Sequence, residues 1–362
     1  MVAELAVDAA PRVRARPQWI HGPWLDAVVA LCWVPFVVGA LWVEAVAPSA
    51  LDAYATAVFL LSFAHQPLTV ALVYGDKERF ALRRAIFTWS PIVFILATFV
   101  GVQVSFVLVA VIGGLWNAEH TLMQRYGLTR IYGRKAGQEE GRLELWMLFS
   151  WLALALIWVA ADPTTPDRAA GLAALGRNNS EAISVLTTLR GVATWLVLPA
   201  LALAAGLFAT WIVREGRRGA AANPAKWLYV GSTALLFGVI LVAPLAGLLG
   251  YVGAHALEYF VVVHHSMGRR YVSADADGGA LLGRAVRARP GRVGFFVVYV
   301  GIIIGIVTLL ERAGSPVLYG VVFFTLGGLH VFYDGFIWKL RQPAVAASVG
   351  LPGGAGAPNP AG

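Results

Sequence analysis

The chain contains ten apolar stretches that approach or exceed the length needed to cross a lipid bilayer, and this restricts the fold more than any other feature. A membrane-spanning helix needs roughly 20 mostly apolar residues. Of the 362 residues, 59% are hydrophobic and 13% are charged, about half the charged share of a soluble protein. We therefore predict an all-α, polytopic transmembrane helix bundle. Its expected spans are residues 25–47, 51–74, 85–100, 102–124, 143–161, 189–213, 226–243, 247–266, 293–311 and 316–338.

The lysine and arginine residues support ten spans with both termini in the cytoplasm. Two boundaries, at Gly101 and within residues 244–250, divide longer apolar runs and decide the count. With these divisions, 24 of the 28 basic residues fall in inner segments and the other four in outer segments. Basic residues concentrate in cytoplasmic loops, so a wrong count would scramble this asymmetry. Topology thus explains the net charge of +8, and we expect a multi-pass protein of the bacterial inner membrane with no nucleic-acid partner.

The remaining segments indicate one helical domain. We expect a single integral-membrane domain over residues 1–345 and a disordered tail, rich in Gly, Pro and Ala, over residues 346–362. The longest outer segment, residues 161–188, is typical of a surface loop with room for one short helix. Cys32 is the only cysteine, which excludes an internal disulfide and a thiolate cluster for iron–sulfur or structural zinc.

Histidines are the most informative residues within the spans. Six of the seven lie in or at the end of an apolar stretch, on four different spans: His65, His120, His255, His264, His265 and His330. Titratable groups inside a membrane are rare and usually functional. All four spans run inward, and residue counts to the next basic loop place every one of these histidines between mid-membrane and the cytoplasmic boundary. We interpret the six as candidate metal ligands contributed by facing helices.

Two carboxylates accompany the histidines at helical spacing. Asp334 follows His330 by one turn, and Glu258 follows His255 by three residues, so each pair shares a helix face. We expect Glu258 and Asp334 to act catalytically, as ligands or as groups that orient imidazoles and move protons. Imidazole with carboxylate suits iron first, with manganese, copper or zinc as alternatives, in a mononuclear or dinuclear site. His264 points roughly away from the stripe that carries His255, which makes it the weakest candidate.

Three segments carry a family resemblance. They are Trp116-Asn-Ala-Glu-His-Thr-Leu-Met-Gln-Arg-Tyr-Gly, His255-Ala-Leu-Glu-Tyr-Phe-Val-Val-Val-His-His and Gly328-Leu-His-Val-Phe-Tyr-Asp-Gly-Phe-Ile-Trp-Lys. In them the chain resembles polytopic, histidine-rich bacterial membrane proteins and, more distantly, the Brp/Blh family of β-carotene 15,15′-dioxygenases. That resemblance implies a non-haem iron held by the analogues His65, His120, His255 and His330. The family's early His-Gly-x-x-Asp element has only a stretched counterpart in His21-Gly-Pro-Trp-Leu-Asp26.

The pattern favours an enzyme over two alternatives. We expect a membrane-embedded metal oxygenase or oxidoreductase acting on a lipid-soluble substrate such as an isoprenoid, carotenoid or acyl chain, with an electron donor as a further partner. Intramembrane histidines and acids also mark ion routes, so an ion or metal transporter or a proton pathway is one alternative. The other is a haem-binding redox protein with paired axial histidines.

Overall fold

The computed structural model of the protein describes residues 19–165, 167, 179–272, 281–287, 291–340, 342, 345, 346 and 351. Most of the expected tail, residues 346–362, lies outside the described residues. Within them every regular element is a helix. The long helices are α1 Pro23–Leu31, α2 Val34–Val46, α3 Leu51–Tyr74, α5 Arg84–Val104, α6 Phe106–Lys135, α7 Arg142–Ala161, α9 Ser180–Gly216, α10 Pro224–Val242, α11 Pro244–Tyr271, α13 Gly291–Ala313 and α14 Pro316–Ile337. The short ones are η1 Pro48–Ala50, α4 Lys77–Ala81, η2 Gly219–Ala221 and α12 Leu281–Arg287.

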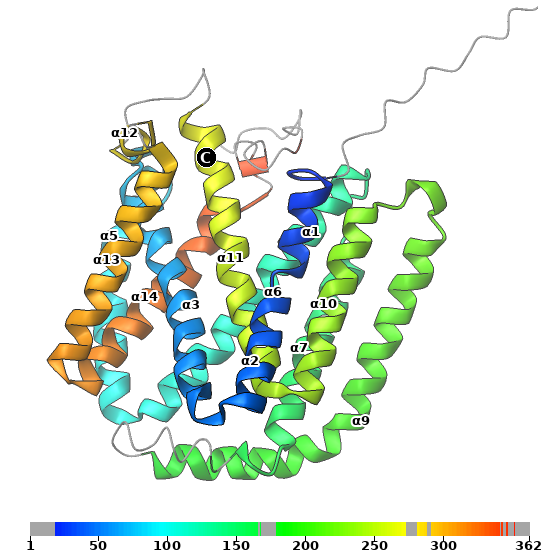
Figure 1. The fold of residues 1–362 in the computed structure, drawn as a ribbon, viewed down its shortest axis with the longest axis horizontal. Coiled ribbons are helices and arrows are strands. Elements are labelled where there is room, and N and C mark those ends of the chain that lie inside the picture. Colours follow the sequence, from blue (N-terminus) through cyan, green and yellow to red (C-terminus); the bar gives the residue numbers. More distant parts are fainter. Residues whose placement is uncertain are drawn as a thin grey trace, which may run out of the picture.

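Within the described part of the chain, ten helical segments are long and apolar enough to cross a membrane, as the sequence predicts for an all-α polytopic bundle. The first of them joins α1 and α2, and the remaining nine are α3, α5, α6, α7, α9, α10, α11, α13 and α14. They stand side by side and alternate in direction (Figure 1). Connections rich in lysine and arginine lie at the end where α1 begins and α6 and α11 end, which is the upper end in Figure 1. We call it the basic end.

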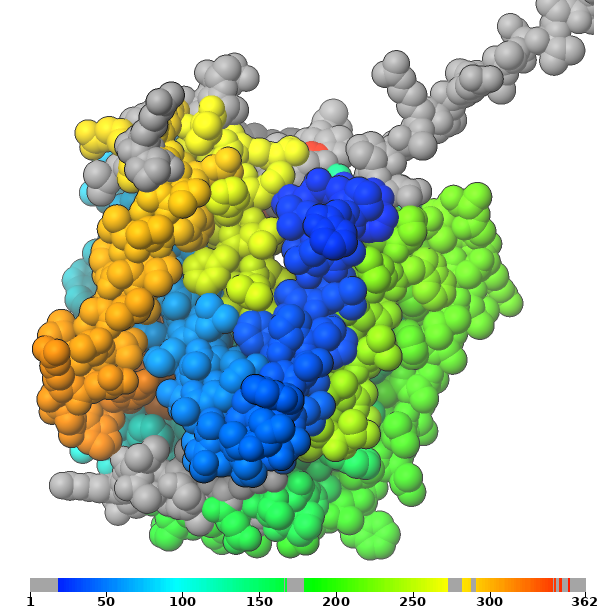
Figure 2. Space-filling model, viewed as in Figure 1, coloured from blue at the N-terminus to red at the C-terminus, as the bar shows by residue number. Residues whose placement is uncertain are grey.

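Helix α11 is the central element of the bundle. Its most apolar window is 72% buried, the highest value among the ten spans. On the face shown in Figure 2, α2 and α3 (blue) cover much of α11 (yellow). Glycine permits the close packing against α2, because a Cβ atom at Gly253 would lie 2.8 Å from the ring of Phe36. Most side chains of α11 therefore face other helices rather than lipid.

The two divided apolar runs do break, although one break is displaced from its predicted position. Helix α5 continues through Gly101, and the chain turns at Ser105, whose hydroxyl accepts a hydrogen bond from the Leu108 amide and caps α6. Gly101 instead allows close packing, since a Cβ atom there would lie 2.8 Å from Val109. The second break lies at Pro244, which begins α11.

Two segments that we expected to lie outside the membrane helices are helical. Residues 125–135, which follow the expected span 102–124, form the last three turns of α6. Residues 180–188, predicted as part of an outer loop, begin α9. The first part of α9 lies across the end of the bundle opposite the basic end before the helix bends upward (Figure 1). Pro199 lies inside α9, and an internal proline removes a backbone hydrogen bond and kinks a helix.

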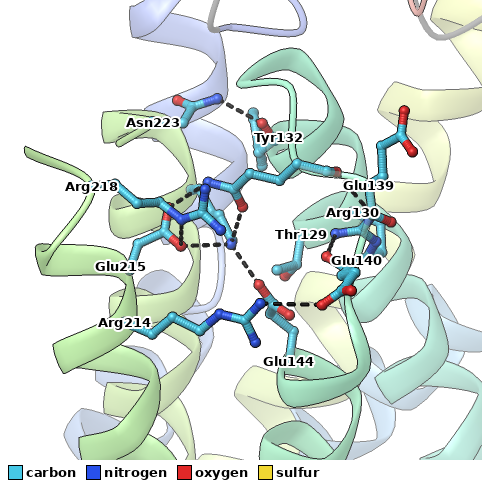
Figure 3. Close-up of polar contacts among 12 residues, drawn as sticks. Thr129, Arg130, Tyr132, Glu139, Glu140, Glu144, Arg214, Glu215, Arg218 and Asn223 are labelled. Carbon is cyan, nitrogen blue, oxygen red and sulfur yellow. Dashed lines mark hydrogen bonds and ion pairs between the residues drawn. The ribbon is translucent and has the colours of Figure 1, made fainter. Parts of the chain in front are cut away.

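A buried ion cluster joins α7, α9 and α10 at the basic end (Figure 3). The Lys226 ammonium on α10 donates to Gln138 Oε1 at 2.6 Å, Glu144 Oε1 at 2.6 Å and Glu215 Oε2 at 3.0 Å. Nearby, the Arg130 guanidinium donates to the carbonyl oxygens of residues 138–140, which fixes the connection between α6 and α7. The three contacts of Lys226 provide one acceptor for each hydrogen of its ammonium group.

Candidate metal centre

Four of the predicted histidines converge on one point inside the bundle, one each from α3, α6, α11 and α14. The imidazoles of His65, His255 and His330 are fully buried, and that of His120 is 11% exposed. The ring centroids form a closed circuit in which His65 lies 4.5 Å from His255 and 4.7 Å from His330. His120 closes it, at 5.1 Å from His255 and 4.7 Å from His330. Residues separated by up to 265 positions in sequence thus surround a common centre.

Two glycines allow α14 to bring His330 to this point. A Cβ atom at Gly328 would lie 2.6 Å from the ring of Phe94 on α5, and one at Gly327 would lie 3.1 Å from Gln66 Oε1 on α3. Because Gly328 has no space for a side chain and Gly327 has little, α14 packs closely between α3 and α5. His330 follows immediately on the same helix and faces His65.

The imidazole nitrogens at the centre are short of hydrogen-bond partners. Both ring nitrogens of His255 are buried without a partner, and His120 Nε2 is also unpaired. Leaving a buried polar atom unsatisfied usually costs about 1–3 kcal/mol. His65 Nε2 and His330 Nε2 face each other at 3.1 Å, so they share either a proton or a cation. A bound metal ion would satisfy several of these nitrogens together, and the residues present therefore fit a metal.

Two overlapping groups of side chains have the spacing of metal ligands. The first is His65, His255 and His330, and the second is His120, His330 and Asp334; in each group the candidate ligand atoms lie within 4.8 Å of one another. His330 belongs to both groups. The second group offers two imidazoles and one carboxylate, a ligand set associated with non-haem iron.

A hydroxyl network orients Asp334 toward the imidazoles. Its Oδ1 accepts hydrogen bonds from Thr69 Oγ1 at 2.9 Å and from the Tyr259 hydroxyl at 3.1 Å. Its Oδ2 points to His120 Nε2 at 3.7 Å and to His330 Nδ1 at 3.9 Å. Thr69 Oγ1 also lies 2.7 Å from His330 Nδ1. Such partners hold a ligand's orientation and its proton, as groups around metal ligands generally do.

The second predicted carboxylate, Glu258, does not reach the centre. Its Oε1 pairs with Arg125 Nη2 at 3.3 Å, and its Oε2 accepts hydrogen bonds from Gln124 and the Tyr229 hydroxyl. Both members of the ion pair are completely buried. Gln124 also donates to the carbonyl oxygen of His255, so the pair lies directly beside this ligand candidate.

His264 and His265 lie apart from the four converging histidines. On α11, His265 is ten residues beyond His255, about 15 Å along the axis. Its ring packs edge-on against His21, with 4.4 Å between centroids, and His264 packs near Phe296. Burial lowers the pKa of His21, which favours its neutral form. The separation along α11 places both histidines outside the coordination distance of the centre.

A cavity of about 580 Å³ adjoins the centre between α6, α11 and α14. His120 and Asp334 form part of its wall, together with Tyr259. Most of the remaining lining is aromatic or aliphatic, as in sites for small organic ligands. A molecule in this cavity would contact the candidate ligands directly.

Three residues of the site were not singled out from the sequence as functional. Tyr259 follows His255 by four residues, so the helical spacing that we used for Glu258 could have identified it. Arg125 carried no such signal, since a basic residue after an apolar run ordinarily marks a membrane boundary. Trp338, the last residue of the expected span 316–338, donates through Nε1 to the Tyr259 hydroxyl at 3.5 Å.

Comparison with known protein families, curated proteins and solved structures finds no match to this chain. We therefore infer the function from the site itself.

Proposed function

We propose that the protein is a membrane-embedded non-haem iron oxygenase or oxidoreductase that acts on a lipid-soluble substrate. The observation that carries the proposal is the circuit of four closely packed imidazoles, several of whose nitrogens have no hydrogen-bond partner, beside an apolar cavity. Buried polar atoms are ordinarily satisfied, so these nitrogens favour binding of a cation. The ligand candidates are His65, His120, His255 and His330, with Asp334 as a fifth.

Iron is the metal that best fits this donor set. Thiolate ligands are absent, and imidazole with one carboxylate suits iron(II) that keeps open coordination positions. When bound, iron would supply the activation of O₂ or another oxidant. An external electron donor would supply reducing equivalents.

The protein's own residues would orient the metal ligands, hold a proton and protect the substrate from water. The Thr69 and Tyr259 hydroxyls hold Oδ1 of Asp334 and leave Oδ2 directed at His120 and His330. Tyr259 lies between this carboxylate and Trp338, so it can hold or move a proton on the side facing the basic end. The apolar walls of the cavity exclude water from the substrate.

The orientation in the bilayer follows from charge. Because basic loops remain in the cytoplasm, we propose that the basic end faces the cytoplasm and that the membrane is the bacterial inner membrane. The centre then lies in the cytoplasmic half of the bilayer, where a soluble electron donor can approach.

The haem alternative is less compatible with the geometry. The proposed axial pair, His65 and His255, has ring centroids 4.5 Å apart in an edge-on arrangement. His120 and His330 occupy the sides toward which a macrocycle between them would extend. The absence of a Soret band from the purified protein would remove this alternative.

Metal analysis of the purified protein tests the proposal. Full-length protein, purified without a histidine tag and reconstituted anaerobically with Fe²⁺, should retain about one or two iron ions per chain after desalting. Addition of a membrane lipid extract and a reductant should then stimulate O₂ uptake. His264→Ala, a histidine outside the centre, is the matched control for adventitious binding. Protein that retains no stoichiometric iron, manganese, copper or zinc would refute the proposal, and tracer metal flux into proteoliposomes would support the transporter instead.

A further inference from the structure

The cavity beside the centre is an elongated groove with chemically different ends. On α6 its lining extends from Trp116 to Ile131, about 22 Å along the helix axis. On the facing side it follows α14 from Val331 to the residues just beyond the helix end, Lys339 and Leu340. It therefore extends from the apolar middle of the bundle to the basic end, with His120 and Asp334 along its length.

Two glycines line this groove at positions where no neighbouring helix packs closely against them. Gly127 on α6 and Gly335 on α14 both line it, and a Cβ atom at either position would meet no atom within 4 Å. Glycine inside a helix is less favourable than alanine by about 1 kcal/mol. Gly328 on the same helix has a packing reason, since its Cβ would clash with Phe94, but Gly127 and Gly335 do not. Their missing side chains leave room for a ligand.

The charges at the two ends of the groove differ in sign. Lys339 lies at the basic end, and Arg134 donates to the carbonyl oxygen of the lining residue Leu340 at 3.2 Å. Neither cation has a carboxylate partner among the residues that the structure describes. The acidic lining residues Glu119 and Asp334 lie deeper, toward the apolar middle. An anionic group is thus attracted to the end near Lys339.

We propose that the groove binds a long-chain fatty carboxylate. Its head group lies against Lys339 and Arg134, and its chain follows α6 toward Trp116. The volume of about 580 Å³ suits one small ligand rather than a two-chain phospholipid. This assignment rests on the proposed function for its chemistry, and it names the substrate class of that site.

The position of the head group sets which carbons meet the metal ligands. Asp334 precedes Trp338 by four residues, about 6 Å along α14, and Lys339 follows directly. His120 lies about 16 Å from Ile131 along α6. With the carboxylate at Lys339, the part of the ligand beside His120 and Asp334 is its hydrocarbon chain and not the head-group carbon.

Equilibrium binding of radiolabelled oleate tests the assignment. Full-length protein in phosphatidylcholine nanodiscs should bind oleate saturably at one site, whereas methyl oleate, which lacks the charge, should compete poorly. Lys339→Gln should weaken oleate binding about fivefold, the value of one cation near an anionic lipid, without changing the binding of the methyl ester. Gly335→Leu should fill the groove and weaken binding at least tenfold. Gly206→Leu is the matched control, since Gly206 is also an exposed helical glycine whose added Cβ would meet no atom within 4 Å.

A measurement on the unmodified chain keeps the test independent of variant folding. Oleate with a mid-chain diazirine should crosslink to peptides of α6 or α14 on irradiation. Equal competition by methyl oleate, full binding by Gly335→Leu, or crosslinks confined to other helices would overturn the assignment. Iron content, measured on the same samples, separates the two proposals: saturable oleate binding without metal refutes only the proposed function, and stoichiometric iron without oleate binding refutes only this assignment.

Discussion

Two buried polar clusters in this bundle differ in how completely their atoms are paired. Around Lys226, three acceptors meet the three ammonium hydrogens, and Gln138 also donates to Glu215 at 2.7 Å. Around the histidines, both nitrogens of His255 and Nε2 of His120 have no hydrogen-bond partner. Both clusters are shielded from solvent, so burial alone does not distinguish them.

The difference in pairing separates a structural cluster from a ligand site. A buried charge is tolerated when neighbouring groups compensate it, and the Lys226 cluster is complete without any further group. The histidine cluster has ligand atoms directed at a shared point and few donors or acceptors to satisfy them. We therefore expect substitutions in the first cluster to alter stability and substitutions in the second to alter metal binding.

The largest effect should follow the loss of the histidine shared by both ligand groups. His330→Ala removes a candidate ligand from each group, and we expect metal affinity to fall at least 100-fold. Metal per chain, measured by mass spectrometry after equilibration with buffered Fe²⁺, checks this. His265→Ala, which changes a histidine outside the centre, should retain the metal. Equal losses in both variants would mean that the metal binds nonspecifically to surface imidazoles.

Disruption of the Lys226 cluster should lower stability and leave metal binding unchanged. Lys226→Met leaves Glu144 without the cation that it contacts at 2.6 Å and leaves Glu215 with only Arg218, at 3.4 Å. Breaking a buried pair typically costs about 3–5 kcal/mol, so we expect a loss of about that size. Thermal unfolding in detergent measures the loss, and metal per folded chain should not change. Lys77→Met, at an exposed position, is the control and should alter stability by about 0.5 kcal/mol or less. A Lys226→Met protein that is stable but metal-free would contradict the division between the two clusters.

A smaller effect is expected from Asp334, which bridges the hydroxyl network and the imidazoles. Asp334→Asn keeps the shape of the side chain but removes the negative charge from the oxygen that faces His120 and His330. We expect metal affinity to fall about 10–100-fold, with retained folding. The control is Glu119→Gln, since Glu119 lines the cavity but has no contact with the four imidazoles among those that the structure records. If both substitutions lowered metal affinity equally, the charge of the cavity and not the geometry of Asp334 would be responsible.

The sequence predicted the membrane spans better than the ion-pair and hydrogen-bond partners of the side chains within them. Length and hydropathy are local properties, so ten spans could be counted before their packing was known. The convergence of His65, His120, His255 and His330 was also predictable, because intramembrane histidines have few other roles. The partner of Arg125 was not predictable. Whether an arginine after an apolar run marks the end of a helix or continues it depends on a carboxylate such as Glu258, which lies 133 positions away.

The same dependence on packing explains the displaced break between α5 and α6. Gly101 and Ser105 both lie in one apolar run, and either residue type can end a helix. The contact of α5 with Val109 decides the outcome, since Gly101 is required there for close approach. Ser105 then caps the next helix, and its hydroxyl also donates to Asn179 Oδ1 at 3.0 Å.

The smallest effect should come from a paired cluster at the solvent boundary, which extends the comparison from the interior to the surface. Asp76 begins α4 and accepts hydrogen bonds from Arg270 Nε at 2.7 Å, from the Tyr271 hydroxyl at 2.5 Å and from the backbone amides of Glu78 and Arg79. Burial alone would raise the pKa of Asp76, but together these donors lower it below its ordinary value of 3.8. Because the carboxylate is favoured in the folded state, Asp76 contributes stability above the unfolded pKa and loses that contribution as the pH falls through the folded pKa.

Asp76→Asn tests this dependence, because asparagine caps a helix about as well as aspartate. The variant should be less stable than the unmodified protein at about pH 6, and the difference between them should shrink at about pH 3, where Asp76 is increasingly protonated. Thermal unfolding midpoints at the two pH values measure this. The effect should be smaller than that of Lys226→Met, because Arg270 is 25% exposed and its attraction to Asp76 is screened by solvent. A difference that grows as the pH falls would show that the hydrogen bonds do not favour the carboxylate. In that case complete pairing, which we use to classify the Lys226 cluster, would not by itself identify a stabilising cluster.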